Sequence, residues 1–300
     1  MKITEPGIYY DVATADYFAD PCIAPSFTQS LAKLMLERSP QHVWTKHPRL
    51  NPIYVADDEG YRKDMAIGNA AHKLMLGRGK ELAVIAADDF RTKDAQKQRD
   101  DAIERGAVPI LMKHYVIAEA MVETAVKQLD DMDLNVQEGR GNTEVVIAWE
   151  EEGGIWLRSM IDFLSKDRRL VVDYKTTSMS CSPYAIGQKL VRDRFDVQAA
   201  FHERGLDVLD PASAGRRRHL FICQESTPPF ALTVVQLPEG VLHIGRRNVE
   251  VATAMWSDCV RTDRWPGYPN CILMADMPQW AENRWLEREE RGQLNIMAAG

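Results

Sequence analysis

Three stretches with the apolar and alternating pattern of strands predict a meander in the middle of the chain. They are Glu144–Trp149, Ile155–Leu164 and Leu170–Thr177. The polar segment 165–169 between the last two is short enough to make them a hairpin. Because successive side chains of a strand point to opposite faces, Asp173 and Lys175 share one face while Tyr174 points to the other. Antiparallel pairing would bring Asp162 to the same end of the sheet.

Apolar residues at helical spacing predict helices on both sides of this meander. The predicted helices are 26–37, 65–76, 91–105, 110–129, 184–204, 238–260 and 279–288, and further short strands are predicted at 81–86, 219–224 and 231–236. Ser26 and Gln29 have the form of a capping box at the start of the first helix. The pattern as a whole predicts an α/β fold, a mixed sheet flanked by helices.

The second helix carries a glycine and a histidine four residues apart. Gly68 and His72 share a helix face, and a glycine there lets another backbone come close. Gly77 follows as the expected C-cap. His72 is open to two interpretations: a histidine satisfied in the core or at the surface, or one that projects to the same site as the two aspartates.

Length and composition are those of an ordinary globular protein. The 300 residues, 45% hydrophobic and 27% charged, are enough for a real core. No linker is long enough to divide the chain, so we expect a single domain, 1–300. Its core is expected at about 60–260, with a helical lead-in, 1–59, and a helical tail, 261–300.

Charge and cysteine usage exclude some classes of protein. A net charge of −7 argues against a protein coated in basic residues, but it does not exclude nucleic acid, since binding follows local charge. Five scattered cysteines without a C-x-x-C pair argue against a disulfide framework or a zinc knuckle. No stretch reaches the roughly 20 apolar residues of a membrane span, and the N-terminus has no apolar signal core. We therefore expect a cytoplasmic protein without a membrane partner.

The charged residues of the meander can be interpreted in two ways, as a surface salt bridge or as part of an active site. Asp173 and Lys175 alone could be a salt bridge on an exposed edge strand. With Asp162 nearby, the same residues outline a metal-dependent phosphodiesterase. Glu144 is either a third carboxylate near the metal or a charge at a strand end.

Four motifs, taken in chain order, resemble those of the RecB-type branch of the PD-(D/E)xK nucleases. Within this branch the sequence is most similar to the RecE type, also called exonuclease VIII, of phage and prophage recombination systems. These motifs are G-x-x-x-H (Gly68, His72), a strand acid (Asp162), D-x-K (Asp173, Lys175) and a helical glutamine (Gln198). The likeness covers about residues 5–286. One position departs from it, because the family often has Q-x-x-x-Y and this chain has His202 at the fourth position.

The resemblance implies a restriction-endonuclease-like core and a divalent metal. Asp162 and Asp173 are expected to bind one or two Mg²⁺ ions, which Mn²⁺ could replace. The backbone carbonyl of Tyr174 and the ring of His72 would complete the shell, with Glu144 as a possible extra acid. Lys175 would orient or deprotonate a metal-bound water, or stabilise the developing charge. The residues expected to hold the DNA backbone are Gln198, His202, Arg192 and Arg194.

The resemblance to the RecE type also implies processive 5′-to-3′ digestion of linear duplex DNA to mononucleotides, leaving a 3′ single strand. A ring-shaped homo-oligomer, such as a tetramer, and a single-strand annealing partner of the RecT type belong to the same implication. Two alternatives stay open at this point. One is an endonuclease or single-strand exonuclease with the same site, and the other is a non-catalytic DNA-binding or assembly protein of the same fold.

Overall fold

The computed structural model describes residues 1–55, 61–136 and 139–293. The chain divides into two compact units, Met1–Gly267 and Tyr268–Gly300. The second unit contains helix α10 (Gln279–Glu290), preceded by a segment without regular structure. Residues 56–60 of the predicted lead-in and 294–300 of the predicted tail lie outside the described residues. The expectation of a single domain stays a prediction.

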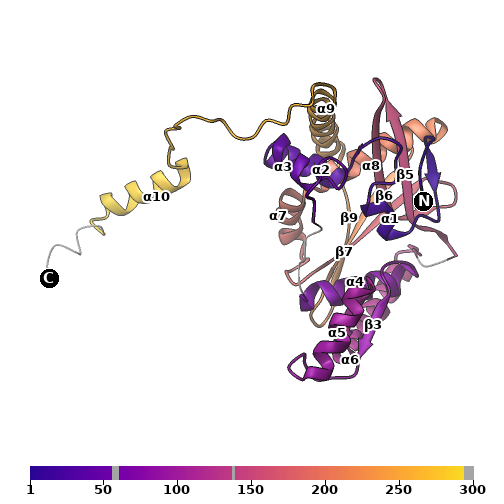
Figure 1. Ribbon diagram of the computed structural model, residues 1–300. Coiled ribbons are helices and arrows are strands. Elements are labelled where there is room, and N and C mark those ends of the chain that lie inside the picture. The colour runs from indigo at the N-terminus through magenta and orange to yellow at the C-terminus, as the bar shows by residue number, and fades with distance from the viewer. Residues whose placement is uncertain (56–60, 137–138, 294–300) are drawn as a thin grey trace. The chain divides into compact units, whose positions relative to one another are not determined.

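A seven-stranded mixed sheet runs through the first unit (Figure 1). Its strands are β1 (Gly7–Tyr9), β2 (Ser26–Phe27), β5 (Gly141–Glu151), β6 (Ile155–Ser165), β7 (Leu170–Thr177), β8 (Arg218–Glu225) and β9 (Leu232–Gln236). The order is β1-β5-β6-β7-β8-β9, and β2 pairs with the far end of β6. Neighbours are antiparallel except for β7 with β8 and β2 with β6. The predicted meander is confirmed as β5-β6-β7.

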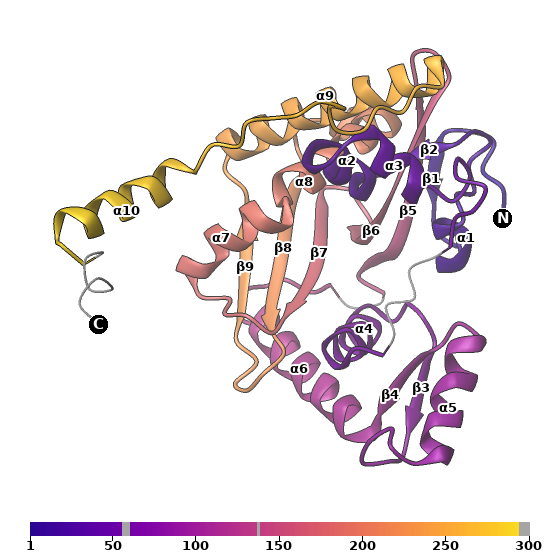
Figure 2. The ribbon, with the colours of Figure 1, turned by 60° about the vertical axis from the view of Figure 1, so that its left-hand side comes forward.

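Helices cover both faces of the sheet, which places the fold in the predicted α/β class (Figure 2). One face packs against α2 (Gln29–Glu37), α3 (Pro40–Lys46), α8 (Phe195–Leu209) and α9 (Glu239–Thr262). The other packs against α4 (Lys63–Leu76) and α6 (Met112–Asp130). The remaining elements are α1 (Thr14–Phe18), β3 (Leu82–Ile85), α5 (Lys93–Glu104), β4 (Val108–Leu111), α7 (Pro183–Asp193) and a short 3₁₀ helix, Pro211–Ser213.

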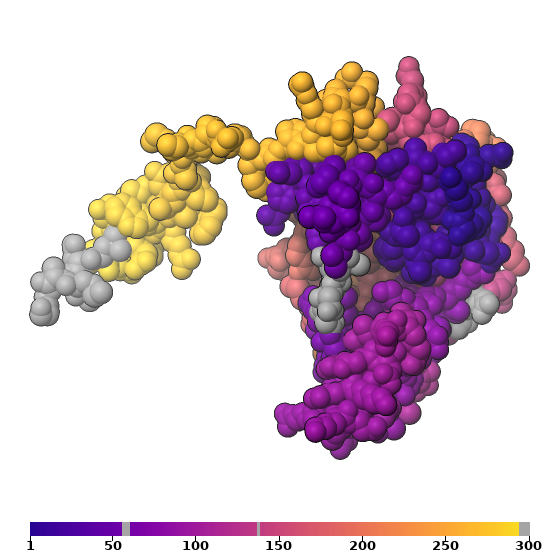
Figure 3. Space-filling view, in the orientation of Figure 1, coloured from indigo at the N-terminus to yellow at the C-terminus, as the bar shows by residue number. Residues whose placement is uncertain are grey.

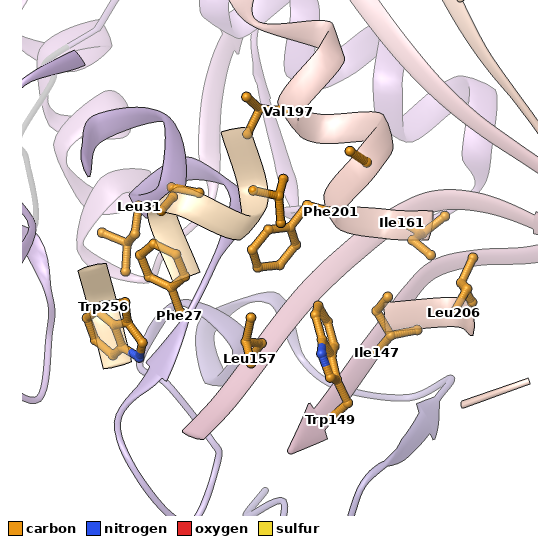
Figure 4. Packing of buried hydrophobic residues seen from close by; sticks show 14 of the residues in the cluster. Phe27, Leu31, Ile147, Trp149, Leu157, Ile161, Val197, Phe201, Leu206 and Trp256 are labelled. Atoms are coloured by element: carbon orange, nitrogen blue, oxygen red, sulfur yellow. The ribbon is translucent and has the colours of Figure 1, made fainter. Parts of the chain in front are cut away.

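Aromatic side chains fix the packing of α8 and α9 on the sheet (Figure 4). Phe27 stacks on Trp256 with ring centroids 4.9 Å apart, and Trp149 meets Phe201 edge to face at 5.3 Å. Burial of a side chain of this size stabilises a fold by about 1.5–3 kcal/mol. The contacts hold the N-terminus of α8, from which Gln198 projects, against the sheet.

The structure corrects three local predictions. Residues 108–111 form β4, parallel to β3, so the helix predicted at 110–129 begins only at Met112. A short apolar run cannot be assigned to strand or helix by periodicity alone. The helix predicted at 184–204 is two helices, because Arg194 adopts a left-handed φ of 53° between α7 and α8. The cap of α2 is Thr28, whereas Ser26 lies in β2 and donates to Asp20.

The N-terminal segment, predicted as part of a helical lead-in, also contributes a strand to the sheet. Strand β1 pairs with β5 and becomes the edge of the sheet. Among the described residues, no helix has both the length and the apolar character that crossing a membrane requires.

Candidate active site

The site forms where strands β6 and β7 part. Their ladder pairs Phe163 with Val172 and Leu164 with Val171. Just beyond these pairs, the carboxylate of Asp162 accepts a hydrogen bond of 2.9 Å from the backbone N–H of Tyr174. A side chain thus satisfies an amide that would otherwise need a partner strand. The hairpin brings Asp162 beside the segment that carries Asp173, as the sequence predicts.

On the other side of β6, the backbone of β5 is strained at Glu144. The register passes from Thr143 opposite Phe163 to Val145 opposite Ile161, and Glu144 between them has a φ of 49°. A left-handed conformation at a residue other than glycine costs on the order of 1–3 kcal/mol and is concentrated at functional sites. Glu144 is buried, and its carboxylate accepts a hydrogen bond from Thr14 at 3.4 Å.

Helix α4 supplies His72, whose Nε2 lies 3.4 Å from Oδ1 of Asp162. A Cβ at Gly79 would lie 3.5 Å from Oε1 of Glu144 and 3.8 Å from Nδ1 of His72, so these two side chains are neighbours. Burial alone would lower the pKa of His72, but the carboxylates of Asp162, Glu144 and Asp173 outweigh it and raise the pKa. The interpretation of His72 as a residue of the same site agrees with this geometry.

Gly68 explains how α4 comes so close to β7. A Cβ at this position would lie only 2.6 Å from Oγ1 of Thr176 on β7. Any larger residue would have to push the helix or the threonine away. The neighbour of this glycine, one turn before His72, is thus a side chain of β7, and the predicted close approach of another backbone stays a prediction.

Strand β7 supplies the ion pair of the D-x-K motif. The Lys175 ammonium lies 2.6 and 3.0 Å from the two carboxylate oxygens of Asp173. Burial opposes ionisation of Asp173, but Lys175 lowers its pKa well below the usual range. Burial would likewise lower the pKa of Lys175, yet Asp173 and Asp162 raise it. Tyr174 points to the opposite face, as predicted, where its hydroxyl donates to Gln224.

Gln198 on α8 binds the other side of the Asp173 carboxylate. Its amide nitrogen donates to the two oxygens at 2.8 and 3.0 Å, and the side chain is buried. In this position Gln198 holds Asp173 in place. The contact of Gln198 with the DNA backbone that the resemblance implies stays a prediction.

Lys33 on α2 also reaches this cluster, although it was not among the residues predicted for the site. Its ammonium donates to the backbone oxygen of Asp193 at 2.7 Å and to Oε1 of Gln198 at 3.5 Å. Burial and the neighbouring charge of Lys175 lower the pKa of Lys33 to about 8. The available signal was a single lysine inside the apolar run LAKLML, but that pattern alone could not say what the lysine would meet.

Three other predicted residues form no hydrogen bond or ion pair with the described residues of this cluster. His202 is buried one turn beyond Gln198, where it stacks on His219 at 5.2 Å, and neither ring nitrogen has a hydrogen-bond partner among the described residues. Arg192 pairs with the adjacent Asp193, and Arg194 binds Asp196 through two nitrogens. Their role in DNA binding stays a prediction.

The donor set suits a hard divalent cation. Asp162 lies 3.4 Å from the imidazole of His72, and the carboxylates of Glu144 and Asp173 are near enough to raise the pKa of that histidine. Oxygen ligands with an imidazole fit Mg²⁺ and Mn²⁺. As the described side chains lie, no three histidine, cysteine or acidic groups converge closely enough to hold an ion, because Asp173 is turned toward Lys175 and Gln198.

The cluster is reachable from solvent. The side chains of Lys175, His72 and Asp162 are 32%, 25% and 17% exposed. On the face shown in Figure 3, the N-terminal segment, indigo to purple, and the layer of α4 to α6, purple to magenta, stand on two sides of a recess. A polar strand end between two such layers can admit a large substrate.

Comparison with known proteins supports the fold. The family described as PDDEXK-like domain of unknown function (DUF3799) matches residues 50–275. Among solved structures, a putative exonuclease from Eubacterium rectale is similar with a TM-score of 0.55 and 10% identity over 89% of this chain and 96% of that chain. A second, SSO0001, has 13% identity over 76% of this chain and 85% of that chain, and its TM-score of 0.26 is too low to support the fold. No curated protein matches the sequence.

Proposed function

The chain belongs to the family of PDDEXK-like domains, within the PD-(D/E)xK nuclease superfamily, and on this premise we propose that it is a metal-dependent nuclease acting on DNA. One observation carries the proposal. Asp162, Asp173, Lys175 and His72 come from three different elements and meet at a solvent-accessible strand end. A structural ion pair would need only two of them.

In this proposal the acids Asp162 and Asp173 bind the metal, with His72 and Glu144 beside them. When bound, a divalent cation supplies a water of lowered pKa and polarises the phosphate. Lys175 is held 2.6 Å from Asp173, and its positive charge would stabilise the negative charge that develops on the phosphate. Gln198 keeps the Asp173 carboxylate oriented.

We further propose that the substrate is linear duplex DNA, digested from 5′ to 3′ with a 3′ single strand left behind. The support is the order of motifs that resembles the RecE type and the name of the Eubacterium rectale protein of similar fold. A single-strand annealing partner of the RecT type would then act on the product.

An assay on linear duplex DNA labelled at either end tests both proposals, the metal-dependent nuclease activity and the 5′-to-3′ direction of digestion. The wild type is assayed with Mg²⁺, with Mn²⁺ and with EDTA, beside Asp173→Asn and a control, Asp258→Asn, which changes an exposed carboxylate on α9. We expect metal-dependent release of the 5′ label by the wild type and the control, and none by Asp173→Asn.

Other outcomes separate the alternatives. Cleavage of circular DNA would establish an endonuclease, and activity on single strands alone would establish a single-strand exonuclease. A wild type that is inert on linear, circular and single-stranded DNA with both metals would overturn the catalytic proposal. Binding without cleavage would then favour a DNA-binding protein of the same fold.

A further inference from the structure

A hollow of about 590 Å³ lies between the turn after β5 and helices α8 and α9. A smaller one of about 200 Å³ adjoins it and shares Glu151, Glu152, Arg204 and Glu250. We call the two together the acidic groove. Glu150 at its mouth is six residues along β5 from Glu144, a distance of about 20 Å. The groove is therefore separate from the candidate active site.

Acidic side chains dominate this groove. Six acids and two arginines line the larger hollow, and its apolar surface comes from Ala200, Val208 and Val249. Arg204 is bound to Glu151 at 2.6 and 2.7 Å, and Arg246 to Glu203 at 2.7 and 3.0 Å. Both arginines are thus already neutralised within the groove wall.

Asp207 is paired with Arg217 and Glu250 with Arg247, so two carboxylates of the groove stay unbalanced. Glu150 and Glu152 are exposed and form no ion pair with any residue that the structure describes. A surface with this surplus repels a phosphate backbone and attracts cationic groups. It therefore fits a positively charged partner and not DNA.

A buried hydroxyl in the same groove also lacks a partner. Thr253 on α9 lines the smaller hollow and is 6% exposed, and its Oγ1 makes no hydrogen bond to the described residues. Buried polar groups without a partner are rare in folded proteins. The oxygen is closed to solvent, so a donor entering the groove would reach it only after a local rearrangement of the groove wall.

Helix α10 of the second unit carries the complementary chemistry. Trp280, Arg284 and Arg288 recur at intervals of four residues and share one face, on which Arg291 and Glu287 also lie and form an ion pair with each other at 3.8 Å. Trp285 borders this face, three residues before Arg288. Arg284 and Arg288 have no ion pair within the described part of the chain. The opposite face carries Glu282, Leu286, Glu289 and Glu290.

The second unit is rich in exposed apolar side chains. Large apolar side chains are exposed throughout it: Ile272, Leu273, Met274, Met277, Trp280, Trp285 and Leu286. Trp280 is 69% exposed, and α10 has no buried residue. Monomers rarely expose contiguous apolar patches above a few hundred Å², and a stable interface buries about 800 Å² on each partner.

We propose that α10 of one copy of the chain docks in the acidic groove of a second copy. Arg284 and Arg288 would meet Glu150 and Glu152, and the tryptophans would cover the apolar surface of the groove. The segment before α10, residues 268–278, can span up to about 36 Å when extended, enough to reach a neighbouring molecule. Each copy offers one helix and one groove, so exchange leaves no contact unused in a symmetric assembly.

Charge reversal of the full-length protein tests this docking. The helix variant is Arg284→Glu/Arg288→Glu, and the groove variant is Glu150→Arg/Glu152→Arg. Light scattering after size exclusion should give the wild type at least twice the 34.0 kDa chain mass and both variants 34.0 kDa. Glu282→Arg/Glu289→Arg changes the opposite face of the same helix, and this control should keep the wild-type mass.

Mixing the two monomeric variants gives the sharpest readout. An acidic helix then meets a basic groove, the unchanged helix meets the unchanged groove, and the mixture should return to the oligomeric mass. A wild type that has a mass of 34.0 kDa at every concentration would overturn the proposal. In that case α10 docks within its own chain or on a different protein. An oligomer that survives both reversals would overturn it too. Circular dichroism of each variant separates loss of docking from loss of folding, and nuclease activity does not enter the measurement.

Discussion

Gly68 offers a direct test of how the fold positions His72. The substitution Gly68→Ala has two opposing effects on stability. Alanine favours a helix over glycine by about 1 kcal/mol. The new Cβ, however, would stand 2.6 Å from Oγ1 of Thr176, and overpacking of this kind costs about 1–3 kcal/mol. We expect a net destabilisation of about 1 kcal/mol.

Gly187 in α7 provides the matched control. A Cβ at Gly187 would meet nothing within 4 Å, so Gly187→Ala should show the helix preference alone and stabilise the protein by about 1 kcal/mol. For a unit of this size, 1 kcal/mol corresponds to a change in melting temperature of about 2–4 °C. Thermal unfolding should therefore show a fall for Gly68→Ala and a rise for Gly187→Ala.

A second substitution isolates the contact itself. In a Thr176→Ala background the hydroxyl is gone, and Gly68→Ala should become stabilising. The coupling between the two changes would then lie within the 0.5–3 kcal/mol found for residues in contact. If Gly68→Ala raises the melting temperature as much as Gly187→Ala does, the close approach of α4 and β7 is not what requires the glycine.

Three further changes probe the site and the core. Gln198→Ala removes both donors to Asp173 and should shift the metal concentration for half-maximal activity upward by about 10–100-fold, the usual effect of losing a group that orients a ligand. Lys175→Ala should lower kcat by about 10²–10³-fold, and Lys175→Arg should not restore it. Burial lowers the pKa of His47 to about 4 despite the nearby Asp20. Since the unfolded chain takes up this proton below pH 6.5, stability in urea should fall by up to about 3 kcal/mol between pH 6.5 and 4.

Each of these three predictions can be contradicted by a specific measurement. Unchanged metal activation in Gln198→Ala would remove its positioning role, and full activity of Lys175→Arg would show that any cation suffices. A His47→Gln variant should flatten the pH dependence, because glutamine does not titrate. An unchanged pH profile in that variant would assign the loss of stability to other groups.

The strand pattern by itself determined the centre of this protein. Period-two alternation separates the two faces of β7, so it placed Asp173 and Lys175 together and Tyr174 opposite. The short polar connection before β7 determined the hairpin that brings Asp162 alongside. These are local properties, set by side-chain periodicity and loop length, and they need no knowledge of the rest of the chain.

Other features depend on contacts between distant segments. Only packing decides that 108–111 pairs with β3 instead of starting a helix, and that Arg194 breaks a helical run. Lys33 reaches Gln198 across 165 residues of sequence. Secondary-structure propensity describes only what a residue prefers locally. Tertiary contacts decided the secondary structure at 108–111 and at Arg194, and they also brought Lys33 to Gln198.

The sequence alone therefore determined the meander, the D-x-K pair and the glycine that precedes His72. Only the tertiary structure decided that Gln198 turns inward to Asp173, that Glu144 takes a strained backbone beside His72, and that β1 becomes the edge of the sheet. The physical reason is the range of the interactions. Alternation and turn length act between neighbours in the chain, whereas these placements arise from burial, ion pairs and ladders that exist only once the layers have packed.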